Sequence, residues 1–445
     1  MIKGFETIYG KELEKYKYIS TKLYHAIKKI GYSELKVPIL EPETSYSENV
    51  IGHSPWPEWN KKGCFYISVQ DYLNTYEEEP NVQDSLLIPE GTVSVTRWLG
   101  EQLDLNNGTN LPIKVFYNMT CFRNEIIKGL NESKKREFTQ FGVEILGTSH
   151  FLSDIEILYI PYYLLNQIGI ESDWVRCRIN DIQIFSKLCE ESSFSIVERT
   201  QIKEMLDELA ENKAGKNVDR YTDNIQKIHL YLEKKEIKAD VLEKWEYLLK
   251  NKLKYIPEEA FRIFGKGYNE LFNRINLVTR MFQNKGLNVE VDLCVIRSHE
   301  YYTSLSFEID VIKDSFLFVE VGGGGRYDKL VKQFVHNTKI DRIPSTGFAF
   351  GLNRLKDMLE KMNIYPDSEN VQIDFNFNLS VNPDLILLEN YEDYIDVFKE
   401  NIEKSGSDGF SFFLGNTLIN QKYISVNNRI FPEDKHDLGM YDSEK

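Results

Sequence analysis

The stretch from residue 114 to residue 147 constrains the fold most strongly, because it predicts two long strands joined by a polar, basic loop. The first run is rich in aromatic and β-branched residues and continues to Phe122 without Gly or Pro. A polar loop follows that contains Gly129, Asn131, Ser133 and three consecutive basic residues, and a second strand is expected from Phe138 to Leu146. We expect the two strands to pair in an antiparallel sheet.

Side chains that alternate along the second strand predict one apolar and one polar face. The apolar face, expected to be core, carries Phe141, Val143 and Ile145. The polar face carries Phe138, Gln140, Gly142 and Glu144, and on the first strand Arg123 and Glu125 share a face. A solvent-exposed sheet face accounts for such alternation. The alternative is a binding floor of charged groups around one aromatic ring.

Composition restricts the class of protein. A chain of 445 residues with 28% charged residues is expected to form a soluble globular protein of two to four domains. No apolar run suits a membrane span or a signal peptide. The five cysteines lack zinc spacing and are expected to be reduced, in a cytoplasmic protein. The net charge of −15 argues against a general nucleic-acid coat, although local patches could still grip RNA.

The segment FRNE, its basic loop and REFTQFGVEILG resemble motif 2 of class II aminoacyl-tRNA synthetases in their histidyl form. Other segments resemble the same family in order along the chain. GYSELKVPILEPETSY resembles motif 1, PEGT the turn that holds the substrate's α-amino group, GGRYDKL a histidine-specific stretch, and the segment ending at Arg354 motif 3. The resemblance covers roughly residues 1–360, with a gap at residues 181–284.

The chain departs from the family's pattern at several positions. Ile88 stands where the family usually has Arg, and Asn353 where it has Glu or Asp. In the segment from Arg297 to Thr303, the middle of the family's Arg-Gly-Leu-Asp-Tyr-Tyr-Thr is replaced by Ser298, His299 and Glu300. Alternation along residues 289–297 places Arg297 at the end of a mostly apolar strand face, where a charge needs an anionic partner.

The resemblance implies an α/β (α+β) fold, in which an antiparallel sheet is flanked by helices. Residues 1–180 are expected to form the first part of the catalytic core and residues 285–362 the second. Helical periodicity and many charges predict a helical insertion over residues 181–284. A reduced α/β C-terminal domain with a disordered, acidic tail is expected over residues 363–445.

The resemblance also implies roles for individual residues. Arg123 and Arg297 would stabilise charge at the α-phosphate of ATP during catalysis. The ATP-binding set comprises Arg123, Glu125, Arg136, Phe138 and Arg354. The amino-acid-binding set comprises Glu90, Thr92, Gln140, Glu144, Tyr302 and Tyr327. For any single arginine an ordinary surface ion pair explains the residue equally well, and the turn at Glu90 is also explained as a plain helix start that the Thr92 hydroxyl caps.

The implied function is ATP-dependent activation of histidine and its transfer to tRNA by a homodimer, with Mg²⁺ on the pyrophosphate side. A paralogue that adenylates an amino acid for another acceptor remains open, because the segment at residues 298–300 is altered and the C-terminal region is reduced. A non-catalytic regulatory subunit of the ATP phosphoribosyltransferase type remains a third alternative. The sequence leaves open the acceptor, the exact amino acid and the role of the insertion.

Overall fold

The computed structural model describes residues 4–51, 63–70, 82–105, 110–124, 135–214, 218–250, 255–296, 301–336, 341–365, 423–426 and 429–432. The segments predicted to carry Glu125, Arg297 and the altered residues 298–300 lie outside these ranges, as does almost all of the C-terminal region. Within the described ranges, none of the helices is both long and apolar enough to cross a bilayer.

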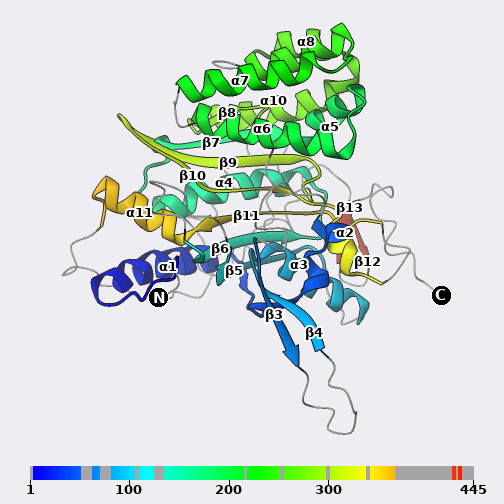
Figure 1. The fold of residues 1–445 in the computed structure, drawn as a ribbon. Coiled ribbons are helices and arrows are strands. Elements are labelled where there is room, and N and C mark those ends of the chain that lie inside the picture. Colours follow the sequence, from blue (N-terminus) through cyan, green and yellow to red (C-terminus); the bar gives the residue numbers. More distant parts are fainter. Residues whose placement is uncertain are drawn as a thin grey trace.

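An eight-stranded sheet forms the centre of the molecule (Figure 1). Its order is β1-β5-β6-β11-β10-β9-β7-β8, and only the outermost pairs, β1 with β5 and β7 with β8, are parallel. The strands are β1 (Ser33–Glu34), β5 (Ile113–Phe122), β6 (Glu137–Leu146), β11 (Ser345–Gly351), β10 (Phe316–Arg326), β9 (Leu305–Lys313), β7 (Val175–Asp181) and β8 (Asn288–Val291). The expected antiparallel sheet flanked by helices is confirmed.

Strand β6 has the predicted faces. The prediction that Arg123 shares a strand face with Glu125 is not confirmed, because β5 ends at Phe122 and Arg123 follows it outside the strand. Phe141, Val143 and Ile145 are fully buried on what we call the back face, while Gln140 and Glu144 lie on the opposite side, which we call the site face. Residues directly opposite in an antiparallel ladder share a face, so Tyr117 of β5, which pairs with Gly142, also belongs to the site face.

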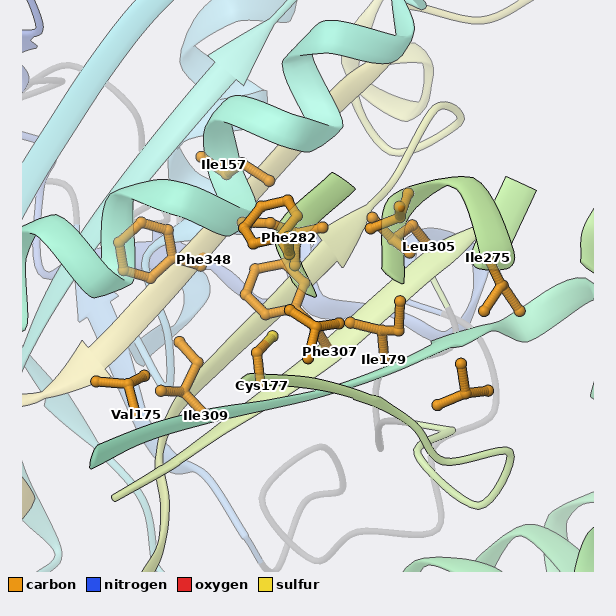
Figure 2. Close-up of a cluster of buried hydrophobic side chains, with 14 of the residues drawn as sticks. Ile157, Val175, Cys177, Ile179, Ile275, Phe282, Leu305, Phe307, Ile309 and Phe348 are labelled. Carbon is orange, nitrogen blue, oxygen red and sulfur yellow. The ribbon is translucent and has the colours of Figure 1, made fainter. Parts of the chain in front are cut away.

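Helices pack on the back face and close the larger hydrophobic core. They are α1 (Lys11–Lys29), α4 (Phe151–Gln167), α10 (Asn269–Gln283) and α11 (Leu352–Met362). Figure 2 shows the centre of this core, where Ile157 of α4 and Phe282 of α10 meet Cys177, Phe307 and other side chains of the strands. On the site face, α3 (Thr92–Asp104) closes a second, smaller core with Tyr117 and Tyr327.

Residues predicted to be a helical insertion form a succession of helices: α5 (Ile182–Glu191), α6 (Ile196–Ala214), α7 (Val218–Glu233), α8 (Ala239–Lys250), α9 (Pro257–Phe264) and then α10. Helices α5 to α8 stand together beyond strands β7 to β9, at the top of Figure 1. The helical character of this region agrees with the sequence pattern, and its boundaries as a domain stay a prediction.

Smaller elements complete the described chain. A second sheet has the order β2 (Leu40–Pro42), β4 (Val82–Leu87) and β3 (Phe65–Gln70). The short helix α2 (Glu48–Ile51) contacts the 3-10 turn that precedes it. Strands β12 (Tyr423–Val426) and β13 (Arg429–Pro432) form a two-stranded sheet. Single 3-10 turns occur at Glu43–Tyr46, Ser172–Trp174, Lys266–Tyr268 and Val331–Phe334.

The predicted strand over residues 289–297 is too long, since β8 ends at Val291. Beyond it the side-chain amide of Asn180 donates to the backbone oxygens of Leu293, at 3.1 Å, and Val295, at 3.2 Å. These side-chain bonds fold the following residues into a turn against the sheet. The alternation of side chains along a strand applies only as far as Val291, so it does not place Arg297 on a strand face.

Candidate active site

Glu144 is the centre of the polar cluster on the site face. Its side chain is fully buried, and its oxygens accept hydrogen bonds from Tyr327, at 2.5 Å, and Thr92, at 2.9 Å, with the Tyr117 hydroxyl at 3.4 Å. Burial raises the pKa of this carboxyl from 4.5 to about 8; the Tyr327 and Thr92 hydroxyls oppose that rise, and the nearby charge of Glu90 adds to it. With this raised pKa the carboxyl of Glu144 holds its proton near neutral pH, so it can donate a hydrogen bond to a polar ligand as well as accept one.

Two glycines provide the space that the side chains of this cluster occupy. Gly347 of β11 pairs with Glu144, and a Cβ at Gly347 would lie 1.5 Å from Oε2 of Glu144. A Cβ at Gly142 would lie 2.0 Å from the Tyr117 ring. The carboxylate and the phenol ring therefore occupy space that any larger residue at these strand positions would fill.

The Glu90 carboxylate caps the N-terminal end of α3. Its carboxylate accepts from the backbone N–H of Thr92, at 2.8 Å, and of Val93, at 2.9 Å. The prediction that the Thr92 hydroxyl caps this helix is wrong: that hydroxyl donates to Glu144, and the preceding carboxylate takes the capping role. Burial raises the pKa of Glu90, while the N–H groups of Val93 and Thr92 favour its charged form.

Gln140 connects strand β6 to the same turn. Its side-chain oxygen accepts from the backbone N–H of Gly91, at 2.8 Å, and from the Cys121 thiol, at 3.6 Å. The residues predicted to bind an amino acid, Glu90, Thr92, Gln140, Glu144 and Tyr327, thus form one hydrogen-bonded group with the backbone of the turn.

Tyr302 lies beside this group. Its ring centre is 4.9 Å from that of Tyr301, which is 6.0 Å from the ring of Tyr327. A Cβ at Gly325 would lie 2.8 Å from the Tyr302 ring, so this glycine also makes room for an aromatic side chain. Tyr302, the remaining residue of the predicted amino-acid-binding set, is therefore connected to Tyr327 through the ring of Tyr301.

Arg123 and Phe138 form the predicted nucleotide side. The Arg123 guanidinium carbon lies 5.0 Å from the centre of the Phe138 ring, which suits a cation–π contact. Its Nε donates to the backbone oxygen of Pro89 at 3.0 Å, which ties it to the turn before Glu90. The backbone oxygen of Arg136 accepts from the Arg123 N–H at 2.8 Å, so both predicted arginines stand at the same end of the β5–β6 pair.

Arg354, near the start of helix α11, is held by strand β10. Its guanidinium lies 5.2 Å from the Phe318 ring and donates to the backbone oxygens of Val319, at 2.5 Å, and Glu320, at 2.9 Å. These oxygens belong to an irregularity in β10, where Glu320 has a φ of 53° and its N–H is held by Asp310 at 2.9 Å. A bulge in β10 therefore anchors the predicted motif 3 arginine.

Sequence reasoning missed Tyr117 and Asp310. Tyr117 could have been found from strand pairing, because a small residue such as Gly142 opposite an aromatic one suggests that the ring crosses the ladder. Asp310 gave no such signal, since the bulge that it supports is visible only in three dimensions.

Two departures from the family pattern have structural partners. The Asn353 side chain accepts from the Thr139 N–H at 3.0 Å and donates to the Tyr16 hydroxyl at 2.7 Å, so it ties α11 to β6 and α1. Ile88 is fully buried in the core beneath α3. Both residues serve packing or bridging roles in which an acidic or basic side chain is not required.

A cluster of three or more His, Cys, Asp or Glu side chains that suits a metal ion is absent from the part of the chain that the structure describes. Mg²⁺ in phosphoryl chemistry commonly needs only one or two carboxylates besides phosphate oxygens and water. Glu125, the predicted acidic residue on the nucleotide side, lies outside the described residues.

The sheet, its helices and the site segments arranged on one face define the fold of a class II aminoacyl-tRNA synthetase. The model of the histidyl-tRNA synthetase family matches residues 87–355, which is more than half of the chain. The chain therefore belongs to the histidyl-tRNA synthetase family.

Similar proteins agree with this family. A histidine--tRNA ligase of Sulfurisphaera tokodaii is 27% identical over 380 residues, covering 83% of this chain and 77% of that protein. A histidine--tRNA ligase of Sulfolobus acidocaldarius is 26% identical over 366 residues, covering 81% of this chain and 75% of that protein.

Solved structures share the fold. The histidyl-tRNA synthetase of Nostoc sp. PCC 7120 superposes with a TM-score of 0.59 at 17% identity, covering 90% of this chain and 83% of that one. An ATP phosphoribosyltransferase regulatory subunit/histidyl-tRNA synthetase from Bacillus halodurans gives 0.58 at 18% identity, covering 81% and 82%. At such identities the likeness concerns the fold alone.

Proposed function

We propose that this chain activates histidine with ATP to form histidyl adenylate and passes the histidine to tRNA. The observation that carries the proposal is the buried Glu144, which is surrounded by the hydroxyls of Thr92, Tyr117 and Tyr327. An imidazole has two distinct nitrogens, which a carboxylate and a tyrosine hydroxyl can recognise together. Family membership supports the same substrate.

The α-amino group of the substrate would bind at the start of α3. Glu90, Thr92 and Gln140 already converge there through Gly91 and Glu144. Because Glu90 is fixed by backbone N–H groups, its carboxylate is held in place before a cationic amino group arrives, which lowers the entropy cost of binding.

ATP would bind on the side of Arg123 and Phe138. In this proposal Phe138 stacks on the adenine, Arg354 covers its other face, Arg136 and Glu125 flank the nucleotide, and Arg123 and Arg297 contact the α-phosphate. The guanidinium group suits phosphate because its planar fork can donate two parallel hydrogen bonds and remains charged. Mg²⁺ would accompany the pyrophosphate portion of ATP.

Adenylation requires no covalent intermediate with the protein. The substrate carboxylate attacks the α-phosphorus, a new oxygen–phosphorus bond forms, and the bond to the pyrophosphate leaving group breaks. The protein's contribution is to align the reactants and stabilise the charge that develops at the α-phosphate. The link from Arg123 to Pro89 supports this role, because it joins the phosphate side to the turn that would hold the amino acid.

The second candidate is a paralogue that uses another amino acid or acceptor. It is favoured by Ser298, His299 and Glu300, which stand before Tyr301 where the family usually has Gly-Leu-Asp. A regulatory subunit without catalytic activity is the third. One pair of assays separates them: ATP–pyrophosphate exchange with each of the 20 amino acids, followed by charging of total tRNA.

Exchange with histidine and charging of tRNA support the proposal. Exchange with histidine and no charging favours the paralogue with another acceptor. Exchange with a different amino acid only rejects histidine as the substrate. The absence of exchange with all 20 amino acids favours a regulatory subunit without catalytic activity.

A further inference from the structure

Arg326 links the candidate pocket to the back of the sheet. It is 2% exposed, and its guanidinium donates to Asp154 at 2.8 Å, to Ser153 at 2.6 Å and to the backbone oxygen of Thr148 at 2.9 Å. These partners lie in and just before the first turn of α4. The side chain of Arg326 therefore fastens the end of strand β10 to the N-terminal end of a back-face helix.

Asp154 is shared with an arginine of the helical region. Its Oδ2 accepts from Arg274 of α10 at 2.5 Å, while its Oδ1 accepts from Arg326. Asp154 is fully buried, whereas the Arg274 side chain is 29% exposed. We call these three residues the Asp154 network. It runs from α10, the last helix of region 181–284, through α4 to β10.

The network ends next to residues of the pocket. Tyr327 follows Arg326 directly and donates to Glu144 at 2.5 Å. The backbone oxygen of Arg326 accepts from the N–H of Thr303 at 2.7 Å, and Thr303 follows Tyr302. A shift of Arg326 would thus move both tyrosines predicted to contact the substrate.

Surrounding packing favours transmission of such a shift. The apolar layer in Figure 2 joins Ile157 of α4 to Phe282 of α10 and to Phe307 of β9, so the two helices and the sheet have few ways to move separately. Removing one partner of a buried ion pair is destabilising. Without the Arg274 guanidinium, Asp154 would keep Arg326 as its arginine partner.

We propose that Arg274 is a positioning residue for the amino-acid pocket, through which the helical region 181–284 sets the placement of Tyr327 and Tyr302. This inference rests on the proposed function for its kinetic test, and on the structure alone for its second test. Arg274 donates to Asp154, which in turn accepts from Arg326, so the effect of Arg274 on the pocket would pass through Asp154 and Arg326.

The kinetic test compares Arg274→Gln with Arg262→Gln in pyrophosphate exchange. Arg262 is a matched control, because it lies in the same helical region on α9, 64% exposed, with a 3.5 Å contact to Glu243. Arg274→Gln should raise the KM for histidine about 2- to 30-fold, the range found for residues that act through a network, with the KM for ATP unchanged. Arg274→Lys, which keeps the charge but not the planar fork, should recover part of the loss.

A rise in both KM values together, or equal effects of the two variants, overturns the proposal. So does full activity in Arg274→Gln. A merely structural role would lower thermal stability without separating the two KM values.

A second measurement does not depend on activity. Hydrogen–deuterium exchange of the backbone N–H groups of residues 326–330 should be faster in Arg274→Gln than in the wild type and unchanged in Arg262→Gln. If the wild type shows no histidine-dependent ATP–pyrophosphate exchange, the proposed function fails. The deuterium measurement still tests whether Arg274 acts on residues 326–330 through the Asp154 network. Identical deuterium uptake in all three proteins rejects it.

Discussion

Replacing Glu144 with Gln removes the ionisable carboxyl at the centre of the candidate pocket and keeps nearly the same shape. The amide can still accept a hydrogen bond from Tyr327 or Thr92, whose hydroxyls contact the two carboxylate oxygens. What the variant lacks is the ability to titrate. Its stability should therefore depend on pH differently from that of the wild type.

The magnitude follows from the pKa of the buried carboxyl. In the folded protein the pKa of Glu144 is raised from 4.5 to about 8, so the folded state holds a proton that the unfolded chain has released. The free energy of unfolding of the wild type then falls as the pH rises from about 4.5 towards about 8. At about 1.4 kcal/mol for each pKa unit, the full effect is at most about 5 kcal/mol. In Glu144→Gln this contribution is absent.

The assay is urea unfolding of both proteins, without ligand, at steps from about pH 4 to about pH 9. These limits bracket the interval from 4.5 to about 8, over which the unfolded and then the folded state release the proton of Glu144. The difference in unfolding free energy, wild type minus variant, should decline steadily across this interval. Glu34→Gln is a suitable control, because Glu34 is exposed on the edge strand β1. Its difference curve shows what the exchange of Glu for Gln does at an exposed position, and the curve for Glu144→Gln is compared with it.

A flat difference curve for Glu144→Gln would refute the reasoning, because it would mean that Glu144 titrates equally in the folded and unfolded states. A curve that rises with pH would refute it more strongly, since it would mean that the three hydroxyls outweigh burial and hold the carboxylate charged. In pyrophosphate exchange, the same variant should lose most histidine-dependent activity, because a site that leaves a buried polar group of the substrate unpaired discriminates strongly against it.

Three further predictions concern the site and the assembly. Arg297→Ala should lower amino-acid-dependent exchange by about 100- to 1,000-fold, the usual cost of one charge-stabilising donor, with the fold intact by circular dichroism; retention of more than about a tenth of the activity contradicts this role. Gly347→Ala should raise the KM for histidine far more than the KM for ATP, because the new Cβ would lie 1.5 Å from Glu144. Gly351→Ala is the control and should leave the KM for histidine unchanged, because its Cβ would meet nothing nearer than 3.7 Å. Equal effects of the two variants would show that the close contact with Glu144 is not decisive. The protein should sediment as a homodimer at micromolar concentration, as expected from the motif 1 resemblance, and a monomer there would count against it.

Local sequence pattern sufficed for strand β6 and its two faces. The two-residue period of a strand depends only on backbone geometry, so residues 138–146 showed which side chains point together before any partner was known. The same pattern brought Gln140 and Glu144 to one face, and family resemblance added Glu90 and Thr92. Helical periodicity likewise indicated the helices of residues 181–284.

Only the tertiary structure decided what surrounds those side chains. Glu144 is buried because β11 lies between β6 and β10 and presents Gly347 opposite it, and because Tyr327 arrives from 183 positions along the chain. The end of β8 was set by side-chain bonds from Asn180, and the place of Arg354 by a bulge in another strand. Strand order and side-chain partners are properties of contacts between distant segments, whose free energies a local period does not contain.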